Sequence, residues 1–240
     1  MFIVLPSAAI ILIYLLAAVL PAVFLLRYIY KQDTVEKEPP GLLFSLLLRG
    51  VLAALLAIVF EELGERVLNT YISDSSSTVY TLVLAFLVVA VVEEGAKFLL
   101  LKQRTWHDPN FNCRFDGIVY AVFVSLGFAA FENVGYVFGY GLQVAVSRAF
   151  LAIPAHMGFS VFMGAYYGRA KLCESCGNLA GMDRNLWTGY LISVLLHGFY
   201  DACAMTGNTL STILFVAFVV IMYIVVIRRI KRESATDTWI

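Results

Sequence analysis

The sequence predicts an all-α fold, a polytopic bundle of transmembrane helices, and three observations lead to this prediction. The 240 residues are 61% hydrophobic and only 14% charged, with a mean hydropathy of +0.83. A soluble protein needs more charged side chains than this to cover its surface. Several apolar runs reach the roughly 20 residues that cross a hydrocarbon core of about 30 Å. Because lipid offers the backbone no hydrogen bonds, and the short alternating segments of a β-barrel are absent, these runs should be helices.

We expect about seven spans within one integral-membrane domain, residues 1–240. In chain order they are Phe2–Leu26, Leu42–Phe60, Val79–Leu101, Asp116–Tyr140, Leu142–Tyr167, Trp187–Met205 and Leu210–Ile227. The first run is longer than the apolar region of a signal peptide and no basic residue precedes it, so we expect a retained span. The break between the fourth and fifth spans, at residues 139–142, is the shortest.

The distribution of Lys and Arg predicts the orientation. Basic residues gather in the loops that follow the first, third and fifth spans and in the C-terminal tail, and Arg66 is the main exception elsewhere. Short loops rich in Lys and Arg lie in the cytoplasm. The N-terminus should therefore be outside and the C-terminus cytoplasmic. The formal net charge of zero provides no general attraction to nucleic acid.

Ionisable residues interrupt four consecutive spans. Such groups are costly at membrane depth, and they usually face a bundle interior or a water-filled cavity. Any one of them could serve only as a structural ion pair or hydrogen bond, but together they predict a shared buried site. They are Glu93, Glu94, Lys97, Glu132, His156, His197 and Asp201.

The spacing of these residues predicts which side chains meet. Glu93 and Lys97 are four residues apart, so they share a helical face and can form an ion pair. Asp201 stands four residues after His197, where it can hold the imidazole in one orientation. His156 belongs to a row of small residues that lets another helix approach closely, and it should face that helix rather than lipid. The row repeats every four positions: Ala152, Ser160, Gly164 and Gly168.

Depth in the membrane gives a second criterion. At about 1.5 Å per residue, Glu93, His156 and His197 lie within about one helical turn of each other. Glu132 is counted nearer the outer face. It would therefore belong to the site only if its span began deeper than Asp116.

Four short motifs carry a resemblance to a known family. "AVVEEGAK" (90–97), "FAAFEN" (128–133), "AHMGFS" (155–160) and "HGFYD" (197–201) occur in the order and span placement of the PrsW family of intramembrane proteases. In addition, "YKQDTVEKEP" (30–39) resembles that family's acidic-proline loop. The resemblance extends over essentially the whole chain. That family is similar to the larger group that contains the CAAX-processing endopeptidases and bacterial immunity-type membrane proteases. This chain departs from the CAAX branch, which has histidine in place of Glu132 and asparagine in place of Asp201.

The resemblance implies an activity, a location and a substrate. It implies an intramembrane endopeptidase, multi-pass in a bacterial cell membrane, that makes the first cut in a membrane-tethered anti-sigma factor. The substrate would then be a single-span protein embedded in the same lipid bilayer.

A second paired-glutamate sequence, "EELGER" (61–66), matches the pattern of the CAAX-processing branch more literally. It stands at the outer end of the predicted second span and is followed by a polar loop. We interpret it as an interfacial turn and expect Glu61 and Glu62 to be dispensable.

The predicted site suits peptide hydrolysis. Glu93 could take a proton from water and return it, with Glu94 as its partner and Lys97 limiting the cost of the charge. His156 could position the water or bind a metal, and His197, oriented by Asp201, could stabilise the oxyanion or be a second ligand.

A metal is an open question at this point. The zinc signature HExxH is missing. Glu132, His156 and His197 would still supply the two histidines and one carboxylate of a zinc protease, so a divalent metal such as zinc and a metal-free mechanism both remain. "CESC" (173–176) is a weak metal signal, which we interpret as structural or incidental.

Two other functions compete with proteolysis. Buried Glu, His and Asp side chains also carry protons in transporters. The sequence shows no inverted repeat or pair of broken helices, which argues against a proton-coupled transporter. A non-catalytic membrane scaffold is the third alternative, and the complete set of motifs argues against it.

Overall fold

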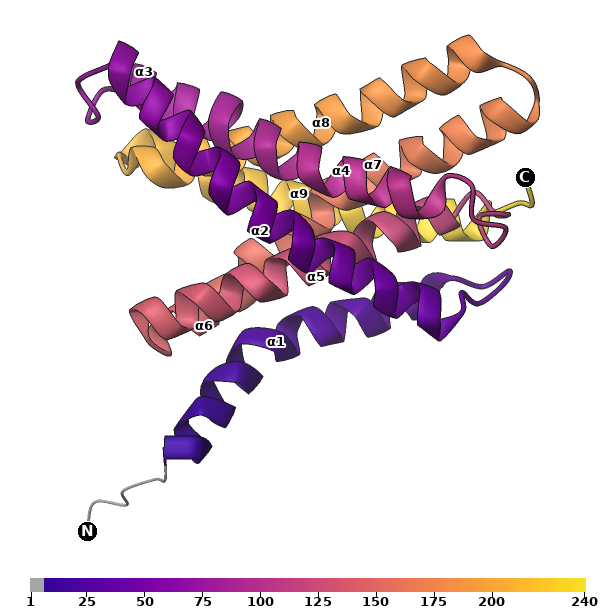
Figure 1. Ribbon diagram of the computed structural model, residues 1–240, viewed down its shortest axis with the longest axis horizontal. Helices are drawn as coiled ribbons and strands as arrows, with labels where there is room; N and C mark the ends of the chain where they lie inside the picture. Colours follow the sequence, from indigo (N-terminus) through magenta and orange to yellow (C-terminus); the bar gives the residue numbers. More distant parts are fainter. Residues whose placement is uncertain (1–6) are drawn as a thin grey trace.

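The computed structural model describes residues 7–240, and within this range the secondary structure is helical with no β-strand (Figure 1). The prediction of an all-α fold is confirmed. The helices are α1 (Ser7–Gln32), α2 (Pro40–Tyr71), α3 (Thr78–Val83), the π-helix η1 (Leu84–Ala90), α4 (Val91–Thr105), α5 (Asp116–Tyr140), α6 (Gln143–Phe150), α7 (Ala152–Ser175), α8 (Leu179–Thr206) and α9 (Thr209–Ala235).

Five segments of the described chain are long and apolar enough to cross a membrane: Ala8–Gln32, Pro40–Tyr71, Asp116–Tyr140, Gln143–Ser175 and Thr209–Ala235. The other two predicted spans fall on residues 78–105 and on α8, which are long helical segments that carry several of the ionisable residues. These polar side chains lower the local hydropathy. The count of seven therefore stays a prediction, and the predicted start of the first span at Phe2 lies outside the described residues.

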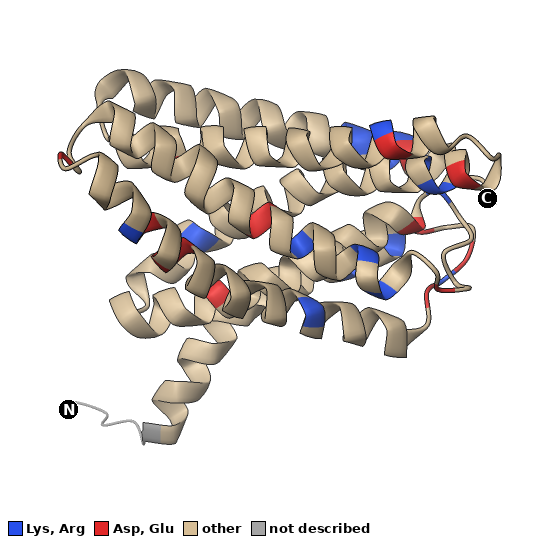
Figure 2. Cartoon of the chain, turned by 45° about the horizontal axis from the view of Figure 1, so that its top comes forward, with Lys and Arg blue, Asp and Glu red and all other residues tan. Residues whose placement is uncertain are grey.

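The loops alternate between the two ends of the bundle. The α1–α2, α4–α5 and α7–α8 connections lie at the same end as the C-terminus, and the α2–α3, α5–α6 and α8–α9 connections lie at the other (Figure 1). Most Lys and Arg residues lie toward the end of the bundle that carries the C-terminus (Figure 2). This alternation is the one that the basic residues predict, while the orientation in a membrane stays a prediction.

Helix α2 is longer than the sequence pattern predicts. It continues to Tyr71, so Glu61 and Glu62 lie inside a helix rather than at its end. The interpretation of this stretch as an interfacial turn is wrong. Leu, Glu and Arg favour the helix, and Gly64 alone is not enough to end it.

Helix α5 lies in the interior and touches two neighbours backbone to backbone. A Cβ atom on Gly127 would lie 2.4 Å from the carbonyl oxygen of Leu47 on α2, and one on Gly164 would lie 2.4 Å from the carbonyl oxygen of Gly117. The predicted close approach along the row of small residues on α7 is therefore confirmed. This packing turns His156 inward, with only 5% of its surface exposed.

The π-helix η1 places α4 against α8. A Cβ atom on Gly198 would lie 2.3 Å from Cδ1 of Phe86, so only glycine allows η1 to pack beside His197. Glu93 follows η1 by three residues. Short π-segments inside helices often occur at functional sites, and here the segment directly precedes the paired glutamates.

Candidate active site

Lys97 connects the acidic pair on α4 to α7. Its ammonium group lies 3.0 Å from Oε2 of Glu93, 2.8 Å from Oε1 of Glu94 and 3.1 Å from Nδ1 of His156. It also lies 3.9 Å from the centre of the Phe128 ring. Lys97 is 1% exposed, so the predicted ion pair with Glu93 is confirmed and is fully buried. A cation surrounded by two carboxylates in this way offsets much of the cost of burying them.

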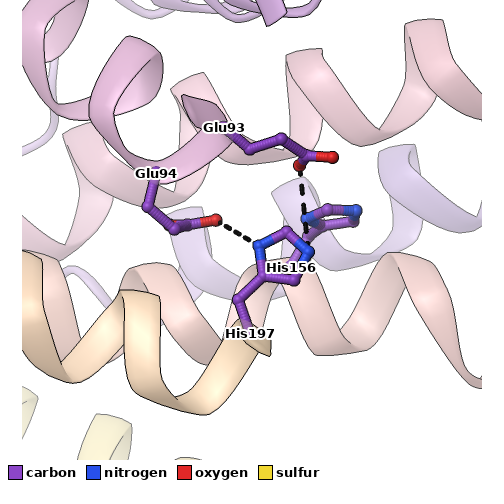
Figure 3. A group of neighbouring side chains, drawn as sticks. All are labelled: Glu93, Glu94, His156 and His197. Atoms are coloured by element: carbon purple, nitrogen blue, oxygen red, sulfur yellow. Dashed lines mark hydrogen bonds and ion pairs between the residues drawn. The ribbon is translucent and has the colours of Figure 1, made fainter. Parts of the chain in front are cut away.

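His197 on α8 lies among three carboxylates, and the most distant is Oε2 of Glu93, 3.9 Å from its Nε2 (Figure 3). Its Nδ1 is 3.0 Å from Oε1 of Glu94, and its Nε2 is 3.2 Å from Oδ2 of Asp201 (Figure 3 shows the first contact). Asp201 contacts the imidazole one helical turn away, as its spacing predicts. The rings of His156 and His197 are 5.2 Å apart between centroids, so α7 and α8 bring both histidines to one place.

Glu132 also belongs to this site. Its Oε2 lies 3.1 Å from Nε2 of His156 and 2.9 Å from the guanidinium of Arg148. The depth count placed Glu132 nearer the outer face and outside the site unless its span began deeper than Asp116. Helix α5 does begin at Asp116, and Glu132 still reaches the site, so the depth count was wrong for this residue. The helices cross at marked angles (Figure 1), so a residue count along one helix does not measure depth in the bundle.

Sequence reasoning missed Arg148 and misplaced Glu61. Arg148 lies on the short helix α6, and its signal was a lone basic residue inside a predicted span. Glu61 lines a cavity of about 540 Å³ that most of the predicted site residues also line. Its neighbour Glu62 instead faces outward and pairs with Arg66 at 2.5 Å. The cavity-lining acids and histidines are Glu61, Glu93, Glu132, His156, His197 and Asp201.

Four side chains converge closely enough to hold a metal ion. Glu93, Glu94, His156 and His197 each offer one ligand atom, and these atoms all lie within 4.8 Å of one another (Figure 3). Oε2 of Glu94 is buried and has no hydrogen-bond partner within residues 7–240, which leaves an acceptor free for a cation. Two imidazoles with a carboxylate are a common zinc donor set. The residues therefore fit a divalent metal, which would take the place of the Lys97 ammonium at Oε1 of Glu94 and Nδ1 of His156.

The remaining metal candidates are not among these four donors. Glu132, which the sequence offered as a ligand, is not in the converging group, although it contacts His156. Sγ of Cys173 lies 3.6 Å from Nδ2 of Asn185, and Cys176 is exposed. Among the described residues neither cysteine joins the converging donors.

Comparisons with known proteins agree on one family. The model of the "PrsW family intramembrane metalloprotease" matches residues 38–227. The chain is 32% identical over 212 residues to "Protease PrsW" of Clostridioides difficile (strain 630), covering 87% of this chain and 86% of that protein. It is 34% identical over 187 residues to the protein of that name in Geobacillus kaustophilus (strain HTA426), covering 77% of this chain and 76% of the relative. The corresponding Bacillus subtilis (strain 168) protein is 30% identical over 185 residues, covering 77% and 79%. No solved structure was found to match.

Proposed function

Because the chain belongs to the PrsW family of intramembrane metalloproteases, we propose that it hydrolyses a peptide bond of a membrane-embedded protein at the site formed by α4, α7 and α8. It is a multi-pass bacterial membrane protein. The observation that carries the proposal is the convergence of two carboxylates and two imidazoles beside a cavity inside an apolar bundle. Peptide hydrolysis needs these groups, because water must be activated and charge on the carbonyl oxygen must be stabilised.

We assign the metal to His156, His197 and Glu94. Three protein ligands with one open position are typical of catalytic zinc sites. Glu94 is completely buried and is the member of the pair that does not line the cavity. A divalent metal bound here would supply a Lewis acid that activates water and polarises the scissile carbonyl.

Glu93 then handles the proton of the attacking water. It lines the cavity, where water can reach it, and Lys97 lies close enough to limit the cost of its charge. Glu93 takes a proton from the water as the carbonyl is attacked, and it returns a proton to the leaving amine. This role needs a carboxylate that faces the substrate. Glu93 meets this requirement because it lines the cavity, whereas Glu94 does not line it.

Asp201 and Glu132 orient the two histidines. Each carboxylate contacts Nε2 of its imidazole, Asp201 at His197 and Glu132 at His156. A carboxylate at the far nitrogen fixes the ring and raises the basicity of the nitrogen that faces a metal. Arg148 in turn holds Glu132 in place.

The substrate we propose is a single-span protein such as an anti-sigma factor, in which this enzyme would make the first cut. The family resemblance supports this substrate, and the position of the site inside the bundle supports cleavage near or within the membrane. A scissile bond in a distant soluble domain would contradict the intramembrane site.

Purified protein in detergent, incubated with a single-span substrate, tests the proposed function. Wild type should generate two fragments, and mass spectrometry should place the cut near or within the span. Glu93→Gln keeps the shape of the side chain and removes its base, so it should lower the rate at least about 100-fold. Wild-type protein that is folded and cleaves no such substrate would argue against proteolysis and favour the transporter alternative.

A further inference from the structure

Glu61 lies where two cavities meet. It lines the cavity of the proposed active site and a second cavity of about 330 Å³ between α2 and α5. Glu93, Glu132 and Tyr136 also line both. The second cavity therefore adjoins the site, and Glu61 is the residue that α2 contributes to the junction.

The walls of the second cavity change from the surface inward. Ile58 and Tyr140 are exposed and form its outer rim, whereas Ala57 and Phe128 are buried and form its inner wall. Apart from the shared carboxylates, the lining is apolar or aromatic with one glycine. A groove of this composition on the outside of an apolar bundle suits a lipid-embedded polypeptide segment.

The helices themselves explain why the groove opens at this position. A Cβ atom on Gly50 would lie 2.0 Å from the carbonyl oxygen of Val124, so α2 and α5 touch backbone to backbone there. Glu61 is about 16 Å further along α2 at 1.5 Å per residue. Beyond the glycine contact, side chains separate the two helices and leave the cavity between them.

The carboxylate of Glu61 has no partner. Its Oε1 is buried without a hydrogen bond to any residue of the described range 7–240. The other carboxylates that line the site cavity are all paired, Glu93 with Lys97, Glu132 with Arg148 and Asp201 with His197. An unpaired acceptor in such a place costs free energy, which is recovered when a donor arrives.

We propose that Glu61 is a substrate-binding residue, which accepts hydrogen bonds from the backbone of a substrate segment that enters through the groove between α2 and α5. This inference rests on the proposed proteolytic function. A transmembrane helix must unwind around a bond before that bond can be attacked, and lipid offers no acceptor to the N–H groups that unwinding releases. A carboxyl oxygen at the junction of groove and site accepts them. This proposal replaces the expectation that Glu61 is dispensable. Glu62 is still expected to be dispensable.

Steady-state cleavage by adjacent variants of α2 tests the assignment. Glu61→Ala should lower kcat/KM by about 10-fold to 100-fold, the range for leaving a buried donor without its acceptor. Glu61→Gln keeps one acceptor oxygen, so its kcat/KM should fall less than that of Glu61→Ala. Glu62→Ala should cleave at the wild-type rate. The melting temperature of Glu61→Ala should not fall, since its carboxylate stabilises nothing in the free protein. A wild-type rate for Glu61→Ala, or equal losses in Glu61→Ala and Glu62→Ala, would overturn the inference.

Cross-linking provides a readout that is independent of turnover. In a Glu93→Gln background with the native cysteines replaced, Glu61→Cys should cross-link to single cysteines around the cut position of the substrate, and Glu62→Cys should not. Equal cross-linking from both positions, or none from position 61, would contradict substrate contact. If wild type cleaves nothing, the proposed function fails; if wild type cleaves and Glu61→Ala is unaffected, only this inference fails.

Discussion

At the scale of single residues, Lys97 decides whether the acidic pair can be buried at all. It contacts Glu93, Glu94 and His156 and is nearly inaccessible. Removing one partner of a buried ion pair leaves an uncompensated charge, which typically costs about 3–5 kcal/mol. Lys97→Met should therefore lower the free energy of unfolding by about that amount, measured by thermal melting in detergent. Lys102→Met on the same helix, where Lys102 forms no ion pair among the described residues, should change it little.

A double variant separates charge from packing at this position. Lys97→Met strands two carboxylates, and Glu94→Gln/Lys97→Met removes the charge of one of them, so the double variant should recover part of the stability that Lys97→Met loses. If the double variant melts no higher than Lys97→Met alone, the uncompensated charge is not the cause.

The residues of the site were largely predictable, because ionisable groups inside apolar runs are rare. Glu93, Glu94, Lys97, His156, His197 and Asp201 were all marked by that contrast, and the structure brings them together. Arg148 and Glu61 were not predictable in the same way. Glu61 stands just past the end of a predicted span, and Arg148 stands in the first turns of another, where a basic residue can still reach the membrane surface. Only the crossing of helices shows that they face the cavity.

At the scale of helices, the site depends on backbone contact between α5 and α7. A Cβ atom on Gly117 would lie 2.5 Å from the backbone nitrogen of Gly168 and 2.6 Å from the carbonyl oxygen of Gly164. The neighbouring atoms are backbone and cannot move aside, so α7 must shift. Gly117→Ala should cost about 1–3 kcal/mol of stability and lower the cleavage rate by displacing His156. Melting curves and cleavage rates of the same preparations measure both effects.

Gly139→Ala is the matched control, because this glycine is also on α5 and a Cβ atom there would meet nothing within 4 Å. It should be neutral or slightly stabilising, since alanine favours a helix more than glycine does. Equal destabilisation by both substitutions would show that the close contact is not what matters.

At the same scale, helix existence was predictable and helix length was not. The bounds of α5 agree with the predicted fourth span, because polar and turn-forming residues flank it on both sides. Helix α2 extends beyond its apolar run because hydropathy marks where lipid ends, not where a helix ends. The reading of Glu61 as part of a turn failed for this reason.

At the scale of the whole molecule, three distant segments meet at the end that carries the C-terminus. The backbone N–H of Ile240 donates to the carbonyl oxygen of Asn112 at 2.7 Å, and the N–H of Arg114 donates to that of Thr238 at 3.1 Å. Close by, Asp33 and Glu38 from the α1–α2 loop are 1% and 3% exposed. Burial raises the pKa of Asp33 to about 6 and that of Glu38 to about 7.

These two carboxyl groups predict a pH dependence of stability. Lys37 opposes the shift at Asp33, and the neighbouring Tyr120 and Asp116 oppose it at Glu38, but burial outweighs them. An acid with a raised folded-state pKa stabilises the fold fully below its unfolded value of about 4, and this contribution is lost as pH rises through about 6 to 7. Wild type should therefore melt at a lower temperature at pH 8 than at pH 5.

The variant Asp33→Asn/Glu38→Gln cannot ionise at these two positions. The difference in melting temperature between this variant and wild type should favour the variant more at pH 8 than at pH 5. Melting curves of both proteins at both pH values measure this difference. The same difference in melting temperature at both pH values would mean that the two carboxyl groups do not titrate in this range.

The central claim is that His156, His197 and the glutamate pair form one metal-binding catalytic site. Metal analysis of purified protein, paired with cleavage rates of the same samples, tests it most directly. Wild type should hold about one divalent metal ion per chain, consistent with a single three-ligand site. His156→Ala and His197→Ala should lose both metal and cleavage, Glu93→Gln should keep the metal and lose cleavage, and Glu62→Gln should keep both. A chelator should inactivate wild type, and zinc should restore it. Full cleavage by metal-free wild type would contradict the claim.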